Sequence, residues 1–116
     1  MSNSVVILGW RRSSPGRESL GIPHFQDFSQ YLQAQVAQGA VDSFEPFLIE
    51  PNSGDLTGFF LIKGDVAKLA AVTASPEWKQ HVLRASLHLD GLTVMRGVAG
   101  EALMTQMRMW GELIPK

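Results

Sequence analysis

The sequence predicts a small α+β domain with an antiparallel sheet that carries its helices on one face. Short β-branched and aliphatic runs alternate with helical patterns in the order β-α-β-β-α-β. The two middle runs are separated by a short turn-forming segment, which is typical of an antiparallel hairpin. This order is the split βαβ, or ferredoxin-like, arrangement, and a further helical segment follows it at the C-terminal end.

Length and composition limit the classes of protein that fit. The chain has 116 residues, the size of one domain, so we expect residues 1–116 to form a single unit. Its net charge is -1, which argues against a general binder of nucleic acid or anionic membranes. It has no cysteine, which excludes disulfides, thiolate metal sites and cysteine nucleophiles. We find no signal peptide and no apolar run of about 20 residues, and therefore expect a cytoplasmic protein of a bacterium-like cell.

The first half of the chain predicts a strand, a loop and a helix. Residues 4–10 (SVVILGW) form the β-branched and aliphatic run of the strand, and residues 11–21 have the Arg, Ser, Pro and Gly content of an exposed loop. From Pro23 onward, apolar residues recur every three or four positions until Gly39 ends the helix. The positions that carry this period are Phe25, Phe28, Leu32 and Val36.

The hairpin comes next, with strands at residues 43–50 and at about 56–63. Pro46 lies within the first of them and favours an edge position or a bulge, because proline cannot donate a hydrogen bond to a neighbouring strand. Residues 51–55 (PNSGD) have the composition of a turn.

Two helices, a strand and a last helix complete the prediction. Ser75 precedes Pro76, and this pair should break the helical segment into helices at about 66–73 and 76–88. Residues 92–98 form the fourth strand, and Gly100 precedes the C-terminal helix. Its apolar stripe consists of Leu103, Met107, Trp110 and Ile114.

The predicted strands are apolar on both faces, although helices cover only one face in this arrangement. The runs VVIL, FLI and FFLI contain no alternating polar residues. A second copy of the chain is the simplest cover for the open face, because twofold dimers are the commonest oligomers. The C-terminal helix is the alternative cover.

With this element order and the segment GFFLIKGDVAKLAAVTASPEW, the chain resembles the dimeric α+β barrel superfamily over roughly residues 4–98. The superfamily includes stress-responsive barrel proteins, antibiotic-biosynthesis-type monooxygenases and uncharacterised bacterial families. The resemblance implies a homodimer with two sheets face to face and a cavity for a small organic ligand between sheet and helices. It implies no particular reaction, because one fold hosts many functions.

Some members of the superfamily are cofactor-independent oxygenases, and others degrade haem with an asparagine, a tryptophan and a histidine. Asn3, Trp78 and His81 are residues of these types, but their spacing does not match, so these roles are not transferred. We predict no cofactor and no metal. Motifs of hydrolases and of nucleotide-binding proteins are absent from the sequence.

His81, Arg84 and His88 share one face of the predicted 76–88 helix and are candidates for a site. His81 is our candidate for acid–base catalysis near neutral pH, and Arg84 and His88 are candidates for binding an anionic group. Histidines seven residues apart lie about 10 Å apart along a helix and cannot both reach one ion. The simpler interpretation, which we favour from the sequence, is a solvated helix face opposite Trp78, Val82 and Ala85.

The loop after the first strand and the large aromatic residues supply the remaining candidates. Arg11 and Arg12 could clamp a carboxylate or phosphate at a pocket rim, or they could lie on a solvated loop balanced by Glu18. Trp10 and Trp78 could line a cavity for a flat apolar ligand, or they could pack in the core or in a dimer contact.

Three hypotheses follow from the sequence. The first is a small homodimeric barrel that binds an organic molecule. The second is a cofactor-independent monooxygenase or isomerase that acts on an aromatic or polyketide-like substrate. The third is an interaction module without a pocket. A cavity that contacts Trp78, His81 or the arginines would favour the first two hypotheses over the third.

Overall fold

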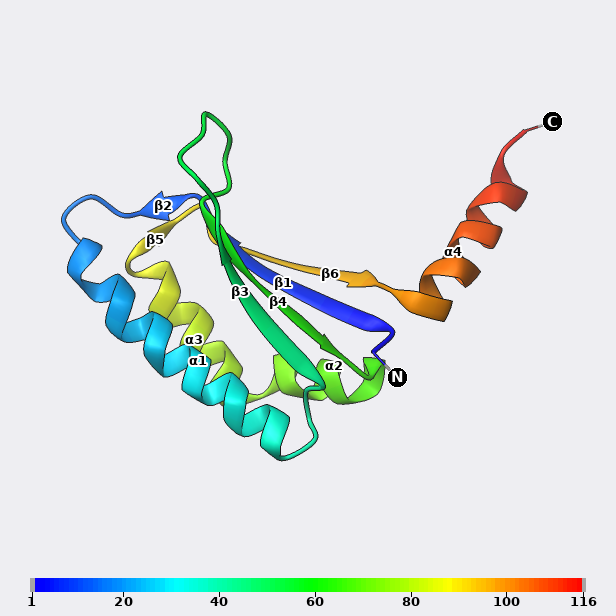
Figure 1. Ribbon diagram of the computed structural model, residues 1–116, viewed down its shortest axis with the longest axis horizontal. Helices are drawn as coiled ribbons and strands as arrows, with labels where there is room; N and C mark the ends of the chain where they lie inside the picture. The colour runs from blue at the N-terminus through cyan, green and yellow to red at the C-terminus, as the bar shows by residue number, and fades with distance from the viewer. Residues whose placement is uncertain (1, 116) are drawn as a thin grey trace.

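The computed structural model describes residues 2–115 and contains a four-stranded antiparallel sheet (Figure 1). Its strands are β1 (Ser4–Trp10), β3 (Ser43–Leu48), β4 (Gly58–Gly64) and β6 (Thr93–Val98). Their spatial order is β3-β4-β1-β6, which is the order of the ferredoxin-like fold. The fold class predicted from the sequence is therefore confirmed, and β3 lies at an edge of the sheet as its proline predicted.

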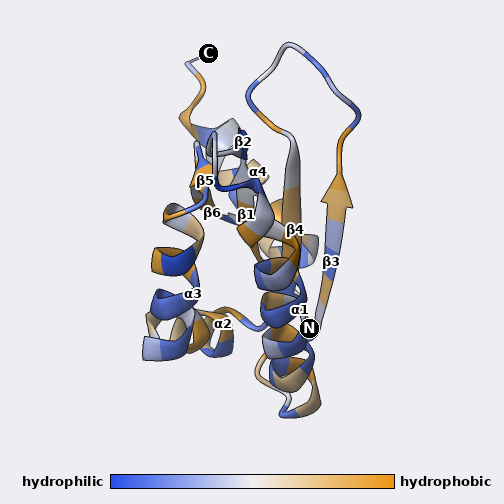
Figure 2. Ribbon diagram, turned by 90° about the vertical axis from the view of Figure 1, so that its left-hand side faces the viewer, coloured by the Kyte–Doolittle hydropathy of each residue, from blue (hydrophilic) through white to orange (hydrophobic). Residues whose placement is uncertain are grey.

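Three helices cover one face of this sheet (Figure 1): α1 (Gly21–Ala37), α2 (Val66–Ala74) and α3 (Pro76–Ser86). The break between α2 and α3 has the predicted cause, because Ser75 accepts a hydrogen bond from the Trp78 amide and Pro76 occupies the first turn of α3. Asp65 caps α2 in the same way. Figure 2 shows α1 and α3 side by side, each with hydrophilic and hydrophobic residues along its length.

The core lies between these helices and the inner face of the sheet. Val6 and Leu8 of β1 and Phe60 and Ile62 of β4 point into it, because the register places Val6 opposite Ile62 and Leu8 opposite Phe60. The helices contribute the buried side chains of Phe28, Tyr31, Leu32, Leu69, Val72 and Trp78. Burying one large apolar side chain stabilises a fold by about 1.5–3 kcal/mol, so this layer holds the helices on the sheet.

The outer face of the sheet is also apolar, but no helix of the described residues covers it. The register places Ile7 between Leu61 and Met95 on this face, and the Phe47 ring stacks on Phe59 with centroids 4.8 Å apart. The C-terminal helix α4 (Gly100–Leu113) projects away from the sheet (Figure 1), and it has no buried residue. The alternative in which this helix covers the outer face is therefore not observed.

The segment predicted to be a plain loop, residues 11–21, contains regular structure. Its β2 strand (Arg12–Ser13) pairs with β5 (Leu89–Asp90), and a short 3-10 helix, η1 (Glu18–Leu20), leads into α1. Helix α3 ends at Ser86, two residues before its predicted end, and so leaves His88 next to the β5 strand. This small second sheet ties the start of α1 to the end of α3.

Candidate functional site

All three histidines of the chain meet between α1 and α3. The Nδ1 atom of His24 lies 2.8 Å from Nε2 of His88, and its Nε2 atom lies 3.1 Å from Nδ1 of His81. Both distances are within hydrogen-bonding range. His24 therefore joins the other two histidines into one hydrogen-bonded row, which we call the histidine chain (His81, His24, His88).

Aromatic neighbours and burial hold the histidine chain in place. His24 comes from α1, stacks on His81 of α3 with ring centroids 5.4 Å apart, and is only 5% exposed. The His81 ring also contacts Phe28 and Tyr31 of α1, at centroid distances of 5.2 and 4.7 Å. His88 follows α3 and is 4% exposed. Five close ring contacts of this kind leave the histidines few alternative rotamers.

The sequence pattern favoured a solvated helix face for His81 and His88, and this prediction is wrong. His81 and His88 turn toward α1, whereas Arg84 lies on the surface and donates to Asp27 of α1 at 2.9 Å. His24 was missed altogether. Its position four residues before Phe28 and seven before Tyr31 places it on the buried face of α1, and that spacing could have identified it.

The histidine chain is not a metal cage. His24 presents a different ring nitrogen to each neighbour, so one ion could not bind it together with both His81 and His88. Across residues 2–115, no group of three or more His, Asp and Glu side chains has the geometry to hold a metal ion. The arrangement instead suits proton exchange between rings.

The histidines are held in the neutral form. Burial lowers the pKa of His24 to about 4, and the nearby Arg84 charge and the other two rings act in the same direction. Burial, followed by Arg84, also lowers the pKa of His81 and that of His88. A neutral imidazole has one donor and one acceptor nitrogen, so each of the three rings can donate one hydrogen bond and accept another at neutral pH.

A pocket of about 460 Å³ opens beside the histidine chain, and all three histidines contribute to its wall. Most of the remaining wall is apolar and includes Leu8, Trp10, Ile22, Phe25, Phe28, Leu48, Phe60, Ala85 and Leu89. Its polar lining also includes Ser13, Glu18 and Gln26. An apolar cavity of this size with a few convergent polar groups is typical of a small-molecule site.

The two tryptophans proposed from the sequence as cavity-lining residues have different roles in the structure. Trp10 lines the pocket and lies 6.1 Å from Phe60 between ring centroids. Trp78 is 4% exposed and packs in the core beside Phe28, so it takes the alternative role considered for it. The sequence pattern did not distinguish these two fates, because a large aromatic residue suits both a cavity wall and a packed core.

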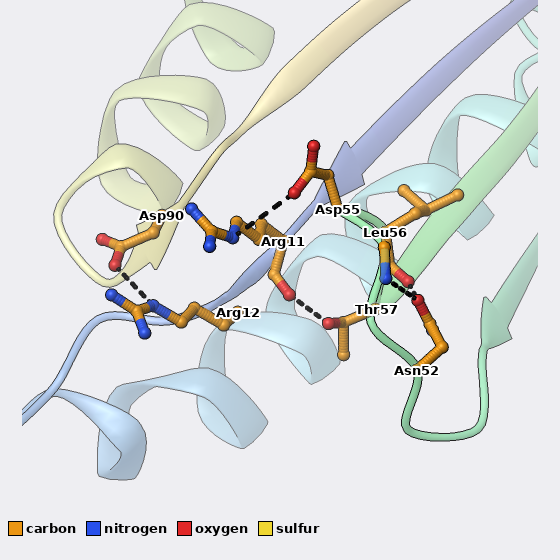
Figure 3. A network of polar contacts seen from close by, with 8 residues as sticks. Arg11, Arg12, Asn52, Asp55, Leu56, Thr57 and Asp90 are labelled. Atoms are coloured by element: carbon orange, nitrogen blue, oxygen red, sulfur yellow. Dashed lines mark hydrogen bonds and ion pairs between the residues drawn. The ribbon is translucent and has the colours of Figure 1, made fainter.

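Arg11 and Arg12 are not among the residues that line the pocket, and both are paired with carboxylates (Figure 3). Arg12 Nε is 3.1 Å from Asp90, whose pKa is lowered by hydrogen bonds from Ser14 and then from Arg12. Arg11 Nε is 3.7 Å from Asp55, and the carbonyl of Arg11 accepts a hydrogen bond from the Thr57 hydroxyl. The expected balance by Glu18 is wrong, because Glu18 accepts from the Gly16 amide instead.

Comparison with known proteins finds solved structures with a similar fold. The structure matches an ethyl tert-butyl ether D (EthD) family protein from Bacillus halodurans with a TM-score of 0.62 and 14% identity, over 84% of this chain and 99% of that one. It also matches a dimeric protein of unknown function and ferredoxin-like fold from Bacteroides fragilis with a TM-score of 0.59 and 8% identity, over 83% and 96%. No protein-family model and no curated protein matches the sequence.

These likenesses show a shared ferredoxin-like fold. Identities of this size carry no residue roles, so the site has to be interpreted from its own geometry. Within residues 2–115, every helix is too short or too polar to cross a membrane.

Proposed function

We propose that the protein binds a small, flat and weakly acidic organic molecule in the pocket between α1, α3 and the sheet. The observation that carries this proposal is the placement of the histidine chain on an otherwise apolar wall. Apolar walls favour a flat ring, and a neutral histidine offers a proton acceptor to an acidic O–H or C–H group. His81 is the proposed contact, and Trp10 the proposed stacking surface.

Proton transfer is the chemistry that this site supports best. A neutral His81 can take a proton from the bound molecule and return it to a different atom, which is the reaction of an isomerase. Cofactor-independent monooxygenation of an aromatic or polyketide-like substrate is the second candidate, because deprotonation would also precede it. The name of the EthD-family neighbour refers to a small organic ether, which agrees with an organic ligand.

We also propose that two copies of the chain pair through the outer face of the sheet. Ile7, Leu61 and Met95 form an apolar row there, and Met95 is 48% exposed in the single chain. Helix α4 adds further unburied apolar area, with Trp110 at 64% exposure. The Bacteroides fragilis neighbour is a dimer, which supports the same assembly here.

Two matched probes test the pocket. 2-Naphthol has an acidic O–H group, whereas 2-methoxynaphthalene has the same ring system and cannot donate. We expect calorimetric titration to show about fivefold to tenfold tighter binding of 2-naphthol, the difference that one hydrogen bond makes. The variant His81→Phe should lose this difference and still bind both rings, and Ser86→Ala, an exposed control on the same helix, should retain it.

Equal affinity of the wild-type protein for the two probes would remove His81 from ligand recognition. Failure of both to bind at millimolar concentration would remove the pocket as an aromatic site. If the protein is an isomerase, His81→Ala should abolish turnover without changing the molar mass in solution, and unchanged turnover would exclude His81 from the mechanism.

A further inference from the structure

We propose that the histidine chain is a proton relay in which all three rings hold the same tautomer and change it together. His24 would carry a proton between His81 and His88, which both line the pocket but differ in how accessible their outer nitrogens are. The use of the relay in a reaction rests on the proposed function of the pocket. The coupling of the tautomers does not, because it follows from the hydrogen bonds of the ligand-free protein.

The coupling follows from which nitrogens face each other. Both hydrogen bonds join an Nδ1 atom of one ring to an Nε2 atom of another: His24 Nδ1 to His88 Nε2, and His81 Nδ1 to His24 Nε2. A neutral ring protonates only one of its nitrogens. If one ring carried its proton on Nδ1 and its neighbour on Nε2, two N–H groups or two lone pairs would face each other. Only two arrangements satisfy both bonds: all three rings protonated on Nδ1, or all three on Nε2.

The two ends of the relay have different surroundings. The Nδ1 atom of His88 is buried and has no hydrogen-bond partner among the described residues. The hydrogen bond of His81 within the chain uses its Nδ1 atom, which leaves Nε2 as its outer nitrogen, and the residue is partly exposed and lines the pocket. The outer nitrogen at the His81 end is therefore open to a ligand, whereas the outer nitrogen at the His88 end is buried. A proton that enters at His81 can be stored in the chain but has no exit at His88.

A transfer step balances within the chain when all three rings begin protonated on Nδ1. The acidic bond of the ligand breaks and leaves its electron pair on the ligand, while its proton adds to Nε2 of His81. The proton on Nδ1 of His81 then moves to Nε2 of His24, and the proton on Nδ1 of His24 moves to Nε2 of His88. His81 and His24 are neutral again, and His88 carries the positive charge as an imidazolium.

This step separates the acquired charge from the ligand by two rings. The reverse sequence returns a proton from Nε2 of His81 to a different atom of the ligand, which completes a tautomerisation such as a keto–enol shift. The charged and titratable groups that face the chain are Tyr31 and Asp27 of α1, Arg84 and Glu77 of α3, and Glu18 at the pocket wall. The positive charge of Arg84 opposes long storage of the proton, so its return is favoured.

Imidazole ¹⁵N NMR tests the coupling directly in the ligand-free protein. The chain contains three histidines, and all of them belong to the relay, so the long-range ¹H–¹⁵N spectrum contains three ring patterns to assign. At pH 7 we expect all three rings to show the same tautomer. Two different tautomers among the three rings would overturn the relay.

Substitutions at the middle ring sharpen this test. His24→Phe keeps an aromatic ring on α1 but removes both hydrogen bonds, and we expect at least one remaining histidine to change tautomer or to average between the two. His24→Asn is a smaller change that serves if the phenylalanine variant does not fold, with folding checked by circular dichroism. Unchanged tautomers in a folded variant would show that the rings are independent and would overturn the proposal.

The relay and the proposed function fail in distinguishable ways. Mixed tautomers together with the expected preference for 2-naphthol would exclude the relay and leave the binding proposal standing. Matching tautomers together with failure of both probes to bind would support the relay and exclude the ligand site. In an isomerase, His24→Phe should lower kcat about tenfold or more with little change in KM, because a positioning residue acts on the transition state rather than on binding.

Discussion

The two faces of the sheet have similar apolar composition and opposite surroundings. Ile62 points to the inner face, where α1, α2 and α3 bury it completely, whereas its neighbour Leu61 points to the outer face and is only partly buried. The inner face also holds the histidine chain and its pocket beside Phe60. An apolar strand residue therefore indicates that a surface is to be covered, but it does not say whether the same chain or another one covers it.

Alanine substitutions at these two neighbours should produce the largest contrast. Ile62→Ala should lower the free energy of unfolding by about 2–5 kcal/mol, because it leaves a cavity in a packed core. Leu61→Ala should cost less than half as much when the protein is dilute, since its side chain already contacts solvent. Urea denaturation at low protein concentration measures both values. Equal losses would show that the outer face is as tightly packed as the core.

Acid should weaken the inner layer through its histidines. The pKa of His24 is about 4 in the fold and 6.5 as the ordinary value, so the unfolded chain binds a proton at a higher pH than the folded one. The contribution of neutral His24 to the free energy of unfolding should be fully present above about pH 6.5. It should fall by on the order of 3 kcal/mol as the pH is lowered to 4. Denaturation in urea from pH 7.5 to 4.5 measures this slope, and His24→Asn should flatten it. A slope that the substitution does not change would assign the acid sensitivity elsewhere.

A charge on the outer face should break the proposed dimer. Leu61→Asp would place an unpaired carboxylate in the buried interface, so we expect the dissociation constant of the dimer to rise at least about tenfold. Val66→Asp is the matched control, because Val66 is 66% exposed on α2 and lies outside the sheet. Light scattering over a dilution series measures both. A wild-type protein that is monomeric, or a Leu61→Asp protein that remains fully dimeric, would contradict pairing through this face.

The smallest expected effect concerns the surface charge beside the histidine chain. Arg84 and Asp27 are each about half exposed, so Arg84→Gln should change stability by less than about 1 kcal/mol. It should nevertheless raise the pKa of His24, His81 and His88, since the Arg84 charge lowers all three. NMR titration measures these shifts, with Lys79→Gln on the same helix as control. Histidine titrations that stay in place would mean that burial alone sets these pKa values.

The element order could be predicted from the sequence because it depends on local patterns. Each signal acts within a few residues: the apolar runs of the strands, the Ser75–Pro76 break between two helices, and Gly39 at the end of a helix. The paired strands β2 and β5 were missed, since two-residue strands are too short to show any periodicity.

The site was predicted only in part, because long-range packing builds it. The sequence identified His81 as a catalytic candidate and offered a cavity wall as one of two roles for Trp10, but it favoured a solvated histidine face, which is wrong. That direction depends on α1, whose His24 lies 57 residues before His81 and 64 before His88. A helical pattern shows which residues share a face, but it does not show which other helix that face will meet.

The burial of all three histidines in one neutral cluster also affects the isoelectric point of the folded protein. The sequence has an isoelectric point of about 6.3, a value that includes positive charge on ordinary histidines. In the fold all three histidines have lowered pKa values, so this positive charge is missing and carboxylates must take up protons before the net charge reaches zero. In isoelectric focusing, the folded protein should therefore have a lower isoelectric point than the urea-unfolded chain. The difference between the two isoelectric points measures how completely folding withdraws the histidines from solvent.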